Sequence, residues 1–99
     1  MLVYVASAYS NGIITENIKK AREYSRREVE KGNIPITPHL YFPQFMDEKT
    51  ERDKAMGMNK ELLGLCEELH VYGRITAGIK QEIEWAKEIR ISIKYYERG

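Results

Sequence analysis

The chain has 99 residues, of which 42% are hydrophobic and 31% are charged, and this balance is typical of one globular domain spanning residues 1–99. Its 16 basic and 15 acidic side chains leave a formal charge of +1, so there is no large positive field to attract nucleic acid or a membrane surface, and neither is expected as a partner. Cys66 is the single cysteine, which excludes an internal disulfide and a zinc site built from cysteines, and favours a small core residue in a reducing compartment.

The N-terminal segment MLVYVASAYS lacks the basic and long apolar parts of a signal peptide, so we expect a cytoplasmic protein. Its apolar run at residues 2–6 is typical of a central parallel strand that is covered on both faces. A polar loop follows, and then Thr15 or Asn17 can cap a helix that Gly32 ends. We expect the inner side of this helix to carry the residues that recur at helical spacing, which are Ile18, Ala21, Arg22, Ser25 and Val29.

The middle of the chain predicts a short strand, an aromatic loop and a second helix. Residues 34–37 form the strand, and Pro38 ends it. The loop that follows carries Tyr41, Phe42 and Phe45, and its length favours a functional segment. These rings fit either stacking on a planar base or a lid that closes the core. The second helix is predicted from Glu51 to Cys66, with an inner side made of Ala55, Met58, Leu62, Leu63 and Leu65.

The C-terminal part adds a third strand at 68–73, a third helix in the segment RITAGIKQEIEWAK and a fourth strand at 91–96. Four strands alternating with three helices predict an α/β fold: a three-layer α/β/α, flavodoxin- or Rossmann-like, four-stranded parallel sheet with strand order 2-1-3-4. In such folds, ligands bind beyond the carboxyl ends of the strands, where the strand order reverses. Three loops are expected to converge there, with the sequences SAYSNG, TPHLYF and GRITAG.

One glutamate of the third helix lies among apolar residues. At about 100° per residue, Glu82 falls within the stripe formed by Ile79, Ile83, Ala86 and Ile89, whereas Glu84 projects toward the charged side. A carboxylate on a core-facing stripe loses solvation. Burial raises its pKa and the nearby helix N-terminus lowers it. An ionised Glu82 is a competent nucleophile or general base, and it fits equally well a structural role as the partner of a backbone amide or of Arg74.

Other polar side chains are expected near the same edge of the sheet. The hydroxyl of Tyr4 needs a partner if it is buried, for which an adjacent carboxylate is suitable, although core packing also explains this residue. Ser7 and Ser10 fit an anion cradle made with loop amides, and turn or capping roles explain them equally well. His39 fits the role of an acid, a base or a hydrogen-bond donor to a ligand, whereas His70 lies within a strand and is expected to be structural.

No cofactor and no metal are expected. The two histidines lack acidic partners at the spacing of metal ligands. The chain contains neither the GxGxxG pattern of dinucleotide-binding proteins nor the GxxxxGK[ST] pattern of a P-loop.

Four segments covering essentially the whole chain carry a family resemblance: VYVASAYS, IPITPHLYFPQF, CEELHVYG and AGIKQEIEWAK. The chain resembles the nucleoside 2-deoxyribosyltransferase-like superfamily, in particular a branch of small bacterial and phage proteins labelled only as a domain of unknown function. This resemblance implies that Glu82 attacks the anomeric carbon of the sugar and that Tyr4 donates a hydrogen bond to Glu82. It also implies that the loop bearing Ser7, Tyr9 and Ser10, with the turn at Gly78, holds the sugar or its 5′-phosphate.

The sequence departs from the pattern of the transferases at several positions. Thr76 stands where they have an aspartate, the third strand ends in Tyr72 and Gly73 without an acid, and Glu84 replaces a small residue. We therefore carry two main hypotheses. The first is an N-glycosidase or deoxyribosyltransferase-like enzyme acting on a nucleoside or a nucleoside 5′-monophosphate, with His39 or the aromatic loop contacting the base. The second is a non-catalytic module that binds a nucleotide or a related metabolite.

A third and weaker hypothesis is a purely structural, oligomer-forming protein. We expect a homo-oligomer, a dimer or higher, because the predicted sheet is small and Trp85 lies off the apolar stripe. The resemblance also implies that sites are completed across subunit contacts. Trp85 fits equally well packing against the C-terminal strand of its own chain.

Overall fold

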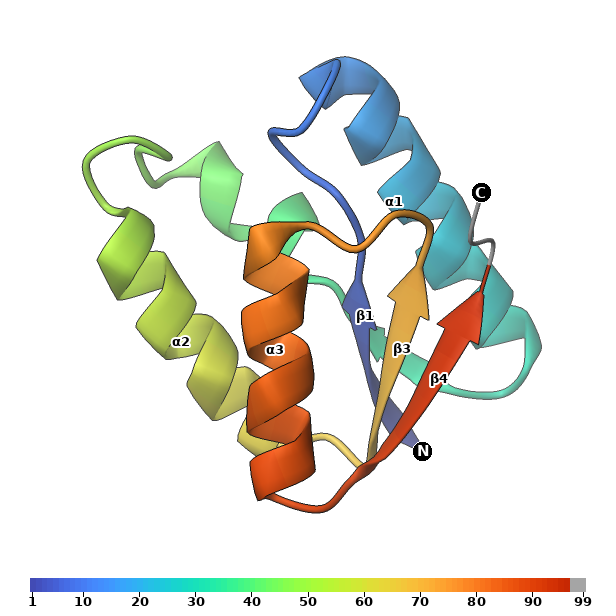
Figure 1. Cartoon of the computed structure of the whole chain (residues 1–99). Helices are drawn as coiled ribbons and strands as arrows, with labels where there is room; N and C mark the ends of the chain where they lie inside the picture. Colours follow the sequence, from blue (N-terminus) through green and yellow to red (C-terminus); the bar gives the residue numbers. More distant parts are fainter. Residues whose placement is uncertain (97–99) are drawn as a thin grey trace.

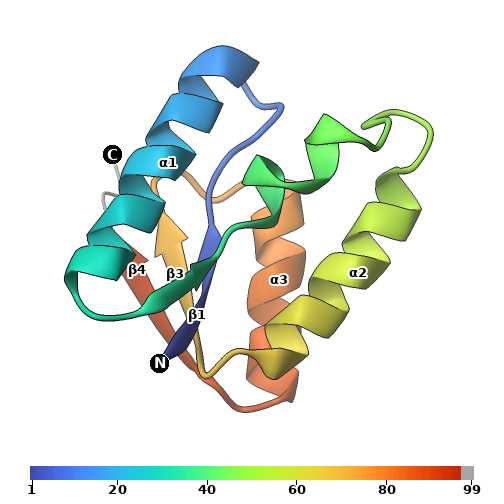
Figure 2. The ribbon, with the colours of Figure 1, turned by 180° about the vertical axis from the view of Figure 1, so that it is seen from behind.

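Four parallel strands form a sheet in the order β2-β1-β3-β4 in the computed structural model, which describes residues 1–96 (Figure 1). The strands are β1 (Leu2–Ala6), β2 (Ile34–Ile36), β3 (Glu68–Tyr72) and β4 (Ser92–Tyr96). Helix α1 (Ile14–Glu30) covers one face, and α2 (Arg52–Leu65) and α3 (Ala77–Glu88) cover the other (Figures 1 and 2). The α/β fold, the parallel sheet and its strand order are confirmed. The last part of the predicted domain, 97–99, lies outside the described residues.

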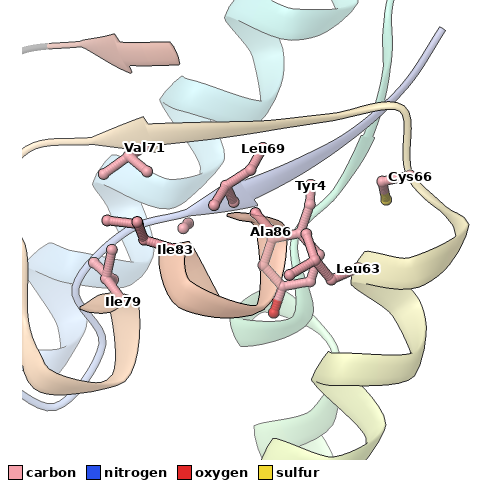
Figure 3. Close-up of a cluster of buried hydrophobic side chains, with 9 residues drawn as sticks. Tyr4, Leu63, Cys66, Leu69, Val71, Ile79, Ile83 and Ala86 are labelled. Carbon is pink, nitrogen blue, oxygen red and sulfur yellow. The ribbon is translucent and has the colours of Figure 1, made fainter. Parts of the chain in front are cut away.

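The core is divided between the two faces because side chains alternate along a strand. On the side of α2 and α3, Tyr4 and Ala6 of β1 and Leu69 and Val71 of β3 pack against apolar side chains of the helices, which include Leu63, Ile79, Ile83 and Ala86 (Figure 3). On the side of α1, a smaller cluster contains Val3, Val5, Tyr24 and Tyr72. Coverage of both faces explains the nearly continuous apolar run of β1.

Helix α1 begins differently from the prediction. Its N-cap is Ile13, and neither Thr15 nor Asn17 caps it. The Asn17 side chain instead donates hydrogen bonds to the backbone carbonyls of Tyr9 (2.7 Å) and Asn11 (2.8 Å), so it fixes the shape of the β1–α1 loop. The sequence could not reveal this because Asn caps helices and braces loops with the same side-chain amide.

The inner side of α1 was only partly predicted. Ala21 is buried as expected, and Ile18 and Ser25 are half-buried, but Arg22 and Val29 are exposed. Two residues outside the predicted set, Tyr24 and Glu28, are buried instead. Glu28 can lie there because strand β3 supplies hydrogen-bond partners for its carboxylate, and such pairing across 42 residues leaves no trace in the helical spacing.

A buried polar cluster forms around Glu28, which is 0% exposed. Its Oε2 atom lies 2.7 Å from Nδ1 of His70 and accepts the hydroxyl of Tyr72 at 2.5 Å, and Asn33 donates to Oε1 at 2.9 Å. Burial raises the pKa of Glu28, but these hydrogen bonds outweigh it and hold the pKa at about 2. Nε2 of His70 lies 2.7 Å from Oε1 of Glu68, so each ring nitrogen of His70 has a carboxylate partner. His70 belongs to the buried framework of the fold.

Four further expectations concern α2, α3 and the residues that follow them. Cys66 is buried, which raises its pKa to about 11, so it is the inert core residue that was expected. Leu65 is 71% exposed, contrary to prediction, because it lies about 200° around the axis from the buried Leu63. Ile89 is also exposed, since α3 ends before it. Trp85 is half-buried against the core of its own chain, with the ammonium of Lys60 5.5 Å from its ring centre.

In the part of the chain that the structure describes, no helix combines the length and the apolar composition needed to cross a bilayer.

Candidate active site

A pocket of about 120 Å³ opens at the carboxyl edge of the sheet, on the side of α2 and α3. It lies between the β1–α1 loop, the two short 3₁₀ turns at Pro38–Leu40 and Phe42–Gln44, and the first turns of α2 and α3. These segments gather at the end of the sheet toward which the strand arrows point (Figures 1 and 2). We call it the Glu82 pocket, after the buried carboxyl group in its wall. Its position matches the edge predicted from the topology.

Glu82 and Tyr4 form a buried pair between α3 and β1. Glu82 is 4% exposed and Tyr4 is 1% exposed. The hydroxyl of Tyr4 donates to Oε2 of Glu82, so the contact that the sequence resemblance implied is present. Figure 3 shows the Tyr4 ring among apolar core side chains, with its hydroxyl oxygen at the end away from the strand. Arg74 is not a partner of Glu82, because it lines a different pocket.

The electrostatic environment holds Glu82 between its two protonation states at neutral pH. Burial raises its pKa to about 7, and the hydrogen bond from Tyr4 acts in the opposite direction. Burial and the neighbouring Glu82 raise the pKa of Tyr4 well above its ordinary value, so Tyr4 remains a donor. Within residues 1–96, Oε1 of Glu82 accepts no hydrogen bond. This carboxyl group therefore has one oxygen fixed by Tyr4 and one without a protein partner, in a wall of the pocket.

His39 sits in the pocket as a neutral ring. Burial lowers its pKa, a hydrogen bond with the backbone of Ser7 raises it, and the charge of Arg52 lowers it, with a net decrease. Its ring packs at 5.2 Å from that of Tyr9. Of the three roles considered from sequence, a hydrogen-bonding role fits a neutral imidazole at pH 7, whereas a general acid needs the protonated form.

Four of the other predicted site residues also reach the pocket, and one does not. Tyr9, Ser10, His39 and Gly78 line it together with Glu82. Ser7 lines another pocket, on the α1 side of the sheet. The reason is the two-residue alternation of β1, which places Tyr4 and Ala6 on one face and continues Val3 and Val5 into Ser7 on the other.

Asn59 and Arg52 are among the pocket residues that were not predicted. Asn59 of α2 is 4% exposed, and its Oδ1 atom has no hydrogen-bond partner in residues 1–96. Asn59 lies four residues from both Ala55 and Leu63, so helical spacing places its amide on the inner side of α2. This pattern could have identified Asn59 from the sequence. Arg52 forms an ion pair with Glu48 at 3.3 Å, and its guanidinium lies 3.8 Å from where a Cβ at Gly78 would be. No pattern in the sequence pointed to Arg52.

The aromatic loop forms one wall of the pocket. Tyr41 and Phe45 pack edge to face, with ring centres 4.9 Å apart, but both are about 60% exposed. Phe42 is the ring of this cluster that lines the pocket, together with Pro43 and Met46. The pocket thus has an apolar wall on the loop side and a polar wall of Glu82 and Asn59 on the helix side.

The fold and the site define an α/β protein with a buried carboxyl group in a pocket at the switch point of a parallel sheet. Residues 1–96 match the family described as a domain of unknown function (DUF7768), and the chain belongs to this family. A search among curated proteins finds no match. In the described residues, no three His, Cys, Asp or Glu side chains gather in a way that could hold a metal ion.

Proposed function

We propose that this protein is an N-glycosidase of nucleosides or nucleoside 5′-monophosphates, related to the nucleoside 2-deoxyribosyltransferase-like superfamily. The observation that carries the proposal is the buried Glu82, with Tyr4 fixing one of its oxygens and the other left without a protein partner in a pocket wall. A carboxylate held in this way has lost solvation and is oriented, which are the properties of a covalent nucleophile.

In the proposed reaction, the ionised Oε1 of Glu82 forms a bond to the anomeric carbon of the sugar. The bond from that carbon to the base nitrogen breaks, and its electron pair leaves with the base, which takes a proton from water. Water then attacks the anomeric carbon of the glycosyl-enzyme, loses its proton to the hydroxide left by the first step, releases the sugar and restores the carboxylate. If a second base attacks instead of water, the same intermediate gives transfer. Tyr4 acts by orienting Glu82 and by favouring its ionised form.

The two walls of the pocket suit the two parts of a nucleoside. The planar base fits the apolar wall at Phe42, Pro43 and Met46. The sugar then lies toward Glu82 and Asn59, where Oδ1 of Asn59 accepts a hydrogen bond from a sugar hydroxyl.

The alternative is a non-catalytic module that binds a nucleoside or a related metabolite in the same pocket. It is favoured by the lack of an evident acid for the departing base. Thr76 caps α3 rather than supplying an acid. Asp47 accepts backbone N–H groups of Thr50 and Lys49, which lower its pKa, and His39 is neutral.

We also propose that the protein is cytoplasmic and that it forms a homo-oligomer. The buried free thiol of Cys66 supports a reducing compartment. Exposed apolar side chains at Ile34, Tyr41 and Phe45 support contacts between subunits.

Release of free base from a panel of nucleosides and 5′-monophosphates, in ribo and deoxy forms, separates the two functions. We expect base release with at least one member of the panel. A protein whose melting temperature rises with these ligands but which releases no base from any of them is a binding module.

Tyr4→Phe is expected to move the pH dependence of base release. Glu82 must be ionised to attack, so kcat/KM for the wild type should rise with pH through about 7. A hydrogen bond to a charged group contributes about 1.5–3 kcal/mol, so its loss should raise this midpoint by about one to two pH units. An unchanged midpoint in Tyr4→Phe would show that the hydroxyl does not tune the nucleophile.

Asn59→Leu is expected to weaken binding and to increase stability. The variant removes a buried acceptor that has no partner within the described residues, and such a group costs about 1–3 kcal/mol. Its melting temperature should therefore rise, while the Kd or KM for a nucleoside should increase about tenfold because the sugar hydroxyl loses its acceptor. Unchanged affinity together with higher stability would assign Asn59 no part in binding.

A further inference from the structure

A second pocket, of about 360 Å³, lies on the α1 side of the sheet. Ser7 and Ala8, directly after β1, and Gly73 and Arg74, directly after β3, line it together with Lys20 and other residues of α1. Because β1 and β3 are parallel neighbours, their two loops meet where the strand order reverses. We call this the α1-side pocket. It is separate from the Glu82 pocket and plays no part in the reaction proposed above.

The hydroxyl of Ser7 is the first indication of a ligand there. Ser7 is 3% exposed, and within residues 1–96 its Oγ atom has no hydrogen-bond partner. Its side chain lies on the α1 face, in line with Val3 and Val5. Buried hydroxyls in folded proteins nearly always have partners. A hydroxyl without one in the wall of a pocket indicates the place of a ligand atom.

The charges around this pocket are the second indication. Lys20 and Arg74 are both cationic, and neither forms an ion pair with a carboxylate of the described residues. Among residues 1–96, no aspartate or glutamate lines the pocket. The Glu82 pocket has the opposite balance of charged side chains, since three carboxyl side chains and one arginine line it. A free anion is therefore attracted more strongly to the α1-side pocket than to the Glu82 pocket.

We propose that the α1-side pocket binds a phosphate group, either as inorganic phosphate or on a small phosphorylated metabolite. The Ser7 hydroxyl donates to one phosphate oxygen. The planar guanidinium of Arg74 donates to two oxygens at once, and the ammonium of Lys20 supplies a further charge. Phosphate oxygens accept hydrogen bonds from hydroxyl, guanidinium and ammonium groups. One phosphate group can therefore pair with the buried hydroxyl of Ser7 and with both cations.

Backbone NMR of the whole chain tests this site at low ionic strength, by titration with inorganic phosphate and, separately, with ribose 5-phosphate. We expect the amide signals of Ser7, Ala8, Gly73 and Arg74 to shift with at least one probe. The probe that binds more tightly identifies the source of the phosphate. Lys20→Ala and Arg74→Ala should each weaken binding about tenfold, whereas Lys19→Ala, an exposed neighbour outside the pocket, should bind as the wild type does.

Three outcomes would overturn the proposal. They are no binding of either probe, equal binding in all three variants, and shifts confined to residues 76–79, which would place the phosphate in the Glu82 pocket. The same titration on Glu82→Gln separates this site from the proposed function. Glu82→Gln should still bind phosphate in the α1-side pocket, whether or not the wild type releases base.

Discussion

Glu82→Gln should lower kcat/KM for base release by about 10³-fold or more, because it removes the attacking oxygen and leaves the rest of the pocket intact. Gln keeps the shape of Glu and still accepts the hydroxyl of Tyr4 through its amide oxygen. Glu84→Gln is the matched control, since Glu84 lies on the same helix but is exposed and outside the pocket. We expect Glu84→Gln to keep wild-type activity. Equal losses in the two variants would contradict a chemical role for Glu82.

The same substitution should make the protein more stable at neutral and higher pH. The folded-state pKa of Glu82, about 7, exceeds its ordinary value of 4.5, so the folded state holds the proton more tightly than the unfolded state. The contribution of the Glu82 carboxyl group to stability is thus fully present below about pH 4.5 and is lost as pH rises through about 7. Chemical denaturation of Glu82→Gln and wild type should show a difference that grows over this interval.

Glu28→Ala should lower the free energy of unfolding by about 3–5 kcal/mol at pH 7, because it leaves the buried His70 and Tyr72 and the half-buried Asn33 without the carboxylate that accepts from them. Urea denaturation measures this loss, which is a large part of the stability of a small domain. Glu30→Ala is the control on the same helix, where the side chain is 61% exposed and its ion pair with Arg26 contributes little.

The effect of Glu28→Ala should depend on pH in one direction. The folded-state pKa of Glu28, about 2, lies below its ordinary value of 4.5, so its contribution is fully present above about pH 4.5 and is lost as pH falls toward 2. The wild type and the variant should converge over that interval. A difference that stays constant down to pH 2 would show that the carboxylate charge does not carry the stability.

The fold and the location of the site could be predicted because they depend on short-range patterns. The nearly continuous apolar run of β1 indicates a strand covered on both faces, and the alternation of strands with helices predicts a parallel sheet. The position of Glu82 among Ile79, Ile83 and Ala86 is likewise visible in the helical period. These signals lie within single elements, and the chain order then places the elements relative to one another.

The remaining features depend on contacts between distant parts of the chain. Glu28 is buried because His70 lies opposite it, 42 residues away. Ser7 and Ser10 lie three residues apart in one loop, yet the end of β1 sends them to opposite sides of the sheet. Arg52 enters the pocket only because the 3₁₀ turns bring the start of α2 beside Gly78. No local pattern encodes such contacts. For this reason Ser7 was predicted beside Glu82 although it lines the α1-side pocket, and Arg52 was not predicted at all.

The proposed function depends on the formation of a covalent bond between Glu82 and the sugar. Its most direct test is the mass of the protein quenched during turnover of a substrate from the panel, with a fluorine at C2′ of the sugar to slow breakdown of the intermediate. We expect a mass increase equal to that of the sugar without its base, located on the peptide that contains Glu82 and absent in Glu82→Gln. Base release without an adduct, or an adduct that persists in Glu82→Gln, would contradict it.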